Sequence, residues 1–189
     1  MSQSHGRRYE HELATDIDTV TTDDVWVTTA GYSGNSGIDG CDLVLTTEPR
    51  WRTQEDAIQY NIEAKKRKGD AGYRVTVFSG SSGDETGEDE LQRLVEGTPG
   101  WADPLVAIKF SYRQLFVADA RWILQFCREE RFDPTIPPAI KKAIEDMEPR
   151  VTRGGSISMI KPKTGVWPSA SAGMDDGEYL ADQLRLPTE

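Results

Sequence analysis

The segment from Ile58 to Lys65 constrains the fold most strongly, because apolar and polar residues alternate along it. A period of two is typical of a β-strand with one face in the core and the other toward a cleft. The residues predicted to face the core are Ile58, Tyr60, Ile62 and Ala64, and those predicted to face the cleft are Gln59, Asn61, Glu63 and Lys65. On the polar face, Glu63 and Lys65 therefore place a carboxylate beside an ammonium group.

A second carboxylate precedes another apolar run. Asp42 comes directly before Leu43-Val44-Leu45, about 20 residues upstream of Glu63. An aspartate at one strand, followed by Glu-x-Lys on the next, can hold a divalent metal ion through hard oxygen donors. The lysine would then orient or activate a water molecule.

A third acidic candidate lies near the N-terminus. Residues 8–20 are predicted to form a helix with an apolar stripe of Leu13, Ile17 and Val20. Glu10 shares the face of that stripe, whereas Glu12 points to the wet side. A glutamate on an apolar stripe is costly to desolvate without a partner, which makes Glu10 a site candidate. The alternative is that Glu10 lies at the edge of the stripe and reaches solvent.

The rest of the pattern predicts an α/β fold with a mixed sheet flanked by helices. Residues 1–127 would form the main domain, and residues 128–189 a C-terminal extension that is partly flexible, with a mobile linker at 164–176. Further strands are predicted at 25–29, 41–46, 57–65, 74–78, 105–110, 115–117 and 156–160. Further helices are predicted at 120–127, 139–147, 178–186, and from a start within 79–90 to about Val95, with Leu91, Leu94 and Val95 inward.

The charge of the chain is strongly acidic, with a net value of −10. Such a surface should repel nucleic acid, yet four basic residues follow one another as Lys65-Lys66-Arg67-Lys68. Only eight of the 22 basic residues are lysine. Few lysines with many carboxylates indicate a halophilic protein, in which overall acidity says little about the partner. The alternative is an ordinary acidic protein with one solvated basic strand end.

Composition also narrows the location and the chemistry. No apolar run approaches the roughly 20 residues of a membrane span, and the N-terminus lacks an apolar signal core, so we expect a cytoplasmic protein without membrane contact. Cys41 and Cys127 have no paired spacing and are expected to act as small buried hydrophobes. His5 and His11 are the only histidines, which argues against a histidine-rich metal site.

Taken in order, these motifs resemble the PD-(D/E)xK nuclease superfamily, and within it the archaeal Holliday junction resolvases. The resemblance covers roughly residues 6–125. It rests on Gly6-Arg7-Arg8-Tyr9-Glu10-His11-Glu12-Leu13, Asp42-Leu43-Val44, Glu63-Ala64-Lys65-Lys66-Arg67-Lys68 and Ala107-Ile108-Lys109-Phe110, with a helix glutamine that could be Gln92. Two features depart from the family: His11 replaces an arginine, and the 47–56 loop is long.

The resemblance implies a restriction-endonuclease-like sheet and a Mg²⁺ site, for which Mn²⁺ would substitute. Asp42 and Glu63 would be direct ligands, Glu10 would ligate the metal or hold its water, and the Ala64 carbonyl would complete the shell. Lys65 would position the attacking water or stabilise charge on the phosphate. The residues implied to contact DNA are Arg7, Arg8, Ser33, Ser36, Lys66, Arg67 and Lys68.

The function that follows is a homodimeric endonuclease that resolves four-way DNA junctions by paired symmetric nicks. The dimer contact would come from the helix at 91–95 or the strands at 105–117. One alternative is a restriction- or repair-type nuclease on duplex DNA, and a second is a non-catalytic DNA-binding module with this fold. A third is an acidic α/β domain in which Glu63 and Lys65 form only a surface ion pair.

Overall fold

The computed structural model describes residues 5–29, 41–47, 58–66, 74–80, 85–111, 114–128, 148–151, 155–160 and 175–189. The side chains of residues 5–8, of Phe126 and of several strand residues lie outside this description. Within these ranges the chain forms a mixed α/β structure, as the sequence predicted, with a five-stranded mixed sheet at its centre.

The central sheet has the strand order β1-β2-β3-β5-β6. Strands β1 (Val25–Thr29), β2 (Leu43–Thr47) and β3 (Gln59–Lys66) pair antiparallel in sequence. Strand β5 (Asp103–Ser111) joins β3 in parallel, and β6 (Gln114–Asp119) returns antiparallel to β5. The crossover from β3 to β5 therefore carries the chain out of the sheet and back.

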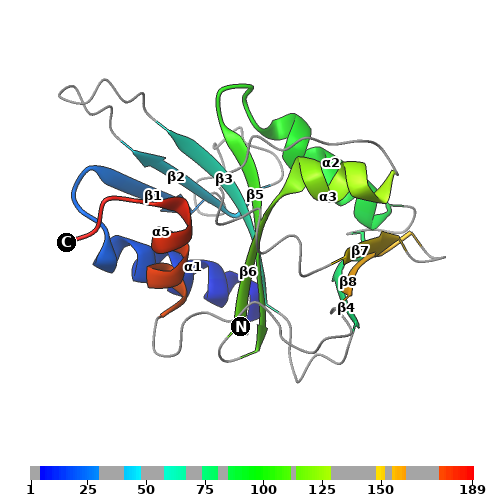
Figure 1. The fold of residues 1–189 in the computed structure, drawn as a ribbon, viewed down its shortest axis with the longest axis horizontal. Helices are drawn as coiled ribbons and strands as arrows, with labels where there is room; N and C mark the ends of the chain where they lie inside the picture. The colour runs from blue at the N-terminus through cyan, green and yellow to red at the C-terminus, as the bar shows by residue number, and fades with distance from the viewer. Residues whose placement is uncertain are drawn as a thin grey trace.

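Helices cover both faces of this sheet (Figure 1). Helices α1 (His5–Val20) and α5 (Asp176–Leu184) pack together on one face, here named the α1 face. Helices α2 (Gly87–Gly97) and α3 (Ala120–Cys127) lie on the other, the α2 face. A small second sheet, with the order β4-β8-β7, lies beside α2 and α3 (Figure 1).

The apolar stripe of α1 anchors the α1 face. Leu13 and Ile17 are fully buried, as the helical spacing predicted, and Tyr9 extends the stripe by one turn. Helix α5 approaches α1 closely because Gly177 has no side chain: a Cβ there would lie 2.4 Å from the backbone carbon of Asp16. Leu180 and Leu184 of α5 complete this layer of the core.

Strand β3 is central, and this changes the expected alternation. Tyr60, Ile62 and Ala64 are buried as predicted, but Ile58 lies before the strand and is 45% exposed, so its assignment to the core was wrong. Gln59 and Asn61, predicted to face a cleft, are also buried and hydrogen-bonded to each other. A strand covered by helices on both faces buries its polar residues too, and a period of two cannot reveal that second layer.

The start of α2 is fixed by a capping box. The Thr86 hydroxyl accepts from the Asp89 N–H, and the Asp89 carboxylate accepts from the Thr86 N–H at 2.8 Å. Leu91 and Leu94 are buried as expected, whereas Val95 is only partly buried. This cap sets the rotation of the first helical turn, which packs against β4 (Arg74–Phe78) and brings Glu90 to Lys65 of β3.

Segments from the C-terminal third join the body of the molecule. Strand β8 (Ile157–Ile160) pairs with β4, and β7 (Glu148–Val151), which the sequence did not predict, pairs with β8. Helix α5 begins at Asp176 and is two residues shorter at its end than the predicted helix at 178–186. The division at residue 127 stays a prediction. The predicted helix at 139–147 lies outside the described residues, as does the predicted linker at 164–176 except for its last two residues. Asp176 is buried in the first turn of α5, so the linker was predicted to end too late.

None of the helices in the described ranges is long and apolar enough to cross a membrane. Cys41 is buried and Cys127 partly buried, and both are free thiols. Burial raises the pKa of the Cys41 thiol to about 12, which keeps it protonated.

Candidate active site

The sheet register places Asp42 opposite Glu63. Leu43 pairs with Ile62 in the antiparallel ladder, so the residue before Leu43 faces the residue after Ile62. The Asp42 N–H donates to the Ile62 carbonyl at 2.9 Å, and the Asp42 carboxylate accepts the Ala64 N–H at 2.8 Å. The two carboxylates therefore belong to the same side of neighbouring strands, as their spacing in the sequence predicted.

Lys65 lies on the α2 face together with Glu63, two residues away. Its Nζ is 2.5 Å from Oε1 of Glu63, and the two side chains are only 19% and 14% exposed. The ammonium also lies 5.4 Å from the centre of the Phe78 ring. In a partly desolvated pair of this kind the attraction between the two charges is stronger than in a solvated surface pair, because the local dielectric constant is lower.

Electrostatics set this cluster apart. Burial, and then the charge of Glu10, raise the pKa of Asp42 to about 6, against the opposing hydrogen bond from Ala64. Burial, and then the charge of Asp42, raise the pKa of Glu63 to about 7, although Lys65 opposes the shift. Glu10 on α1 is partly buried and acts on Asp42 through its charge. Burial and a neighbouring carboxylate thus raise the pKa of both Asp42 and Glu63, and three carboxyl groups share the one ammonium of Lys65.

This donor set fits a hard divalent cation. Carboxylate oxygens are the ligands that Mg²⁺ takes, and a cation would relieve the repulsion between Asp42 and Glu63. Within the described ranges, however, no three His, Cys, Asp or Glu side chains already surround one point where a metal ion could be held. The structure thus supplies a facing pair of carboxylates rather than a complete coordination shell, and the metal-ligand roles of Asp42, Glu63 and the Ala64 carbonyl stay predictions.

Sequence reasoning missed Glu90. This residue of α2 places Oε1 at 2.6 Å from Nζ of Lys65, while Gln92, the expected family glutamine, instead donates to Glu96 at 2.6 Å. Glu90 lies four residues before the buried Leu94 and so shares its helix face. The criterion that selected Glu10, an acid on an apolar stripe, could have found it.

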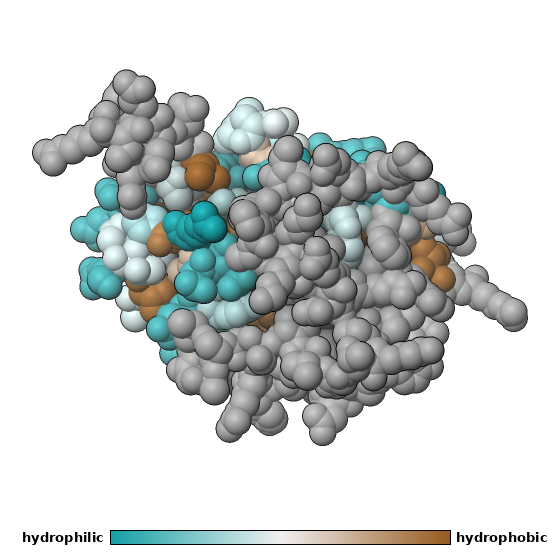
Figure 2. All heavy atoms as spheres, viewed as in Figure 1, coloured by the Kyte–Doolittle hydropathy of each residue, from teal (hydrophilic) through white to brown (hydrophobic). Residues whose placement is uncertain are grey.

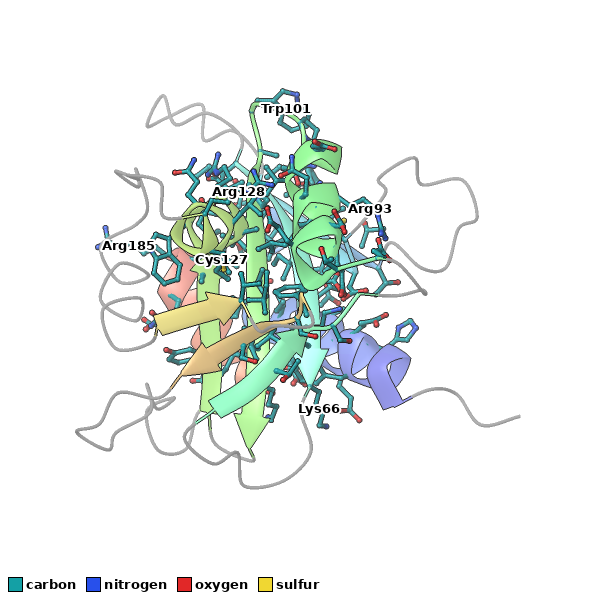
Figure 3. All side chains as sticks on the ribbon, turned by 90° about the vertical axis from the view of Figure 1, so that its right-hand side faces the viewer. Lys66, Arg93, Trp101, Cys127, Arg128 and Arg185 are labelled. Atoms are coloured by element: carbon teal, nitrogen blue, oxygen red, sulfur yellow. The ribbon has the colours of Figure 1, made fainter. Side chains whose placement is uncertain are left out.

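Lys66 lies away from this cluster. It follows Lys65 directly and therefore points to the α1 face, where its Nζ is 5.3 Å from the Tyr9 ring centre and 3.6 Å from Glu12. It lies at the end of the sheet beside α1, opposite Trp101 (Figure 3). Its neighbour in the ladder, Lys109, pairs with Asp176 of α5.

The remaining residues predicted to contact DNA are not placed by the structure. Ser33, Ser36, Arg67 and Lys68 lie outside the described residues. Arg7 and Arg8 belong to α1, but their side chains lie outside the description as well. His11, which stands where the family has arginine, is exposed on α1.

No family model and no curated protein matches the chain. Among solved structures it is similar to Hjc, a Holliday junction resolvase from the archaeal hyperthermophile Archaeoglobus fulgidus. The two share 19% sequence identity over 61% of this chain and 78% of that chain, with a TM-score of 0.41. At that score the similarity assigns no role to any residue.

Proposed function

We propose that this protein is a metal-dependent endonuclease with a restriction-endonuclease-like fold that resolves four-way DNA junctions. The observation that carries the proposal is the facing pair Asp42 and Glu63, with Lys65 on the same side of the sheet. These three side chains stand in the order and spacing of the nuclease motif in the sequence. Their partial burial distinguishes them from a surface ion pair, which would be fully solvated.

In this proposal Asp42 and Glu63 hold Mg²⁺, or Mn²⁺ in its place, with Glu10 assisting from α1. A bound Mg²⁺ would lower the pKa of a water molecule and offset negative charge on the phosphate. Asp42 is oriented for this task by the Ala64 N–H. Lys65 holds a positive charge beside the reacting phosphate and orients the attacking water.

Two copies of the chain are part of the proposal. Paired symmetric nicks in a four-way junction need two sites related by a two-fold axis, and an isologous dimer supplies them. Basic residues near each site would grip the DNA backbone, with Arg7, Arg8, Arg67 and Lys68 as candidates beside Lys66. Ser33 and Ser36 would contact the strand that enters the site.

Cleavage of matched substrates tests the proposal. The protein is incubated in multimolar potassium chloride with a synthetic four-way junction or a linear duplex of the same arm sequence, with Mg²⁺ or with a chelator. We expect paired nicks in the junction that require Mg²⁺. The Asp42→Asn variant, whose amide oxygen can still accept the Ala64 N–H, should bind the junction and leave it uncut.

Each other outcome removes a defined part of the proposal. Equal cleavage of junction and duplex would leave a nuclease without junction selectivity. Binding without cleavage would favour a DNA-binding module of the same fold. Sedimentation at the same salt concentration tests whether the protein is a dimer. If the protein neither bound nor cut DNA, the whole proposed function would be wrong.

A further inference from the structure

Glu90 is the one acidic side chain of α2 that contacts the cluster on β3 in the described part of the chain. We infer that Glu90 is a positioning residue: it holds the Lys65 ammonium in place while Glu63 is engaged in catalysis. The inference rests on the proposed nuclease function. Glu90 itself need not touch the DNA or the metal ion.

Three different elements fix the Lys65 side chain. Glu63 of β3 lies 2.5 Å from its Nζ, Glu90 of α2 lies 2.6 Å away, and the buried Phe78 of β4 presents its ring at 5.4 Å. A flexible four-carbon side chain held at its tip from three directions has few remaining rotamers. The ammonium is therefore preorganised at one point.

Glu90 is itself held rigidly. Its second oxygen, Oε2, accepts the Gly80 N–H at 3.3 Å. The turn that carries it packs directly on β4 because Gly87 has no side chain, and a Cβ there would lie 2.4 Å from the Phe78 carbonyl oxygen. The Gly87 N–H also donates to the Gly155 carbonyl at 2.9 Å, which ties the helix start to the strand β8 region.

The pairing of Lys65 with both Glu63 and Glu90 matters once a divalent cation binds at Glu63. If Glu63 alone paired with Lys65, its negative charge would have to serve both the lysine and a divalent cation. Once a cation shares that charge, the hold of Glu63 on the ammonium weakens. Glu90 keeps an undivided carboxylate on Lys65, so the ammonium stays where the phosphate would lie.

Other acids of α2 are engaged elsewhere and provide controls. Glu88 pairs with Arg128 at 2.5 Å, and Glu96 accepts from Gln92 at 2.6 Å. Glu96 is exposed on the same helix, so Glu96→Gln changes the net charge of α2 by the same amount as Glu90→Gln. It does so without touching Lys65.

The test compares Glu90→Gln with Glu96→Gln in single-turnover cleavage of the junction. The glutamine has one acceptor oxygen and can serve Lys65 or Gly80, not both. We expect Glu90→Gln to lower the cleavage rate at saturating protein by about 10-fold to 100-fold, the effect of losing one charged hydrogen bond. The junction Kd should stay within about 2-fold of the parent, and Glu96→Gln should change neither value.

A second measurement needs no DNA and separates this inference from the proposed function. Reductive methylation followed by mass spectrometry reports how accessible each lysine is. In Glu90→Gln we expect faster modification of Lys65, with Lys66 and Lys109 unchanged. Faster modification at all three lysines would indicate loss of structure and overturn the inference, as would an unchanged rate at Lys65.

The metal requirement supplies the last distinction. If Glu90→Gln raised the Mg²⁺ concentration needed for half-maximal cleavage, Glu90 would be a metal ligand and the positioning role would be wrong. A parent protein that cuts no DNA would refute the nuclease proposal, and with it a role for Glu90 in cleavage. In that case the methylation rates would still decide whether Glu90 holds Lys65.

Discussion

Lys65 and Lys66 are neighbours in the sequence, but they belong to two regions with different electrostatics. On the α2 face, Lys65 is shared by Glu63 and Glu90, and burial followed by the charge of Asp42 raises the pKa of Glu63. On the α1 face, Lys66 is 45% exposed and contacts the half-exposed Glu12 over the Tyr9 ring. The first arrangement has an excess of buried negative charge, and the second is a solvated ion pair.

This contrast distinguishes the candidate site around Lys65 from the contacts that hold α5 on the sheet. Beside Lys66, Lys109 pairs with the buried Asp176 at the start of α5 and lies 6.0 Å from the Tyr9 ring centre. These contacts join α5 to the sheet. On the visible surface over α1 and α5, hydrophilic residues are mixed with hydrophobic ones (Figure 2). A basic residue next to a catalytic motif is therefore not automatically part of it, since the strand pleat sends neighbours to opposite faces.

The largest expected effect is the difference between Lys65→Met and Lys66→Met. Methionine keeps most of the apolar length and removes the charge. We expect Lys65→Met to lower the cleavage rate by about 100-fold to 1000-fold, the effect of deleting one preorganised donor. Lys66→Met should weaken junction binding by less than about 5-fold, as for an exposed charge. Single-turnover cleavage measures the rate and filter binding measures the affinity, each for both variants. If Lys66→Met lowered the cleavage rate as much as Lys65→Met, the assignment of the two lysines to different regions would be wrong.

The two close glycine contacts give the next test. Gly87→Ala pushes α2 from β4, and Gly177→Ala pushes α5 from α1, because each new Cβ would meet backbone atoms at 2.4 Å. Both substitutions should lower the free energy of unfolding by about 1–3 kcal/mol or more. Only Gly87→Ala should slow cleavage by the folded protein, because it moves Glu90 and Phe78 relative to Lys65. Chemical denaturation and cleavage rates are measured together, and slower cleavage in Gly177→Ala would contradict the separation of the faces.

The pH dependence of stability tests whether Asp42 is destabilised as a charged group in the folded protein. The folded protein raises the pKa of Asp42 to about 6, so its carboxyl binds a proton more tightly folded than unfolded. Stability is then lost as pH rises from the ordinary aspartate range through about 6. Without divalent ions, Asp42→Asn should be more stable than the parent by about 1–3 kcal/mol at pH 8 and nearly equal at pH 4. The exposed Asp18→Asn is the control, and parallel curves for parent and Asp42→Asn would contradict the prediction.

The smallest expected effect is stabilisation by Mg²⁺ itself. A cation that binds only the folded state raises its stability by about 1.4 kcal/mol at roughly ten times its Kd. Thermal unfolding at constant ionic strength should show this gain for the parent and not for Asp42→Asn or Glu63→Gln. Lys66→Met should retain the gain, since Lys66 lies on the α1 face. If Asp42→Asn showed the same gain in stability with Mg²⁺, the assignment of the metal ion to Asp42 and Glu63 would be wrong.

Local sequence patterns correctly predicted several helices and strands. The helix at Leu13 and Ile17 agrees with the prediction because its apolar residues recur at helical spacing, and the strand at 25–29 and the helix at 120–127 have the predicted bounds. The same reasoning failed for Ile58, Gln59 and Asn61, where the sheet is covered on both sides. Strand β7 was missed because its four residues, Glu148–Val151, include Pro149 and show no alternation.

By itself the sequence determined the pairing of Glu63 with Lys65 and the spacing that brings Asp42 beside them, since strand periodicity is a local property of the backbone. Only the tertiary structure decided that Glu90 also holds Lys65, because the cap of α2 and the close contact of Gly87 with β4 bring Glu90 to a strand about 25 residues earlier in the chain. Only it decided, too, that Lys109 pairs with Asp176 of α5 while Lys66 contacts Glu12 of α1. Contacts between distant elements depend on how whole layers pack, and no window of neighbouring residues encodes them.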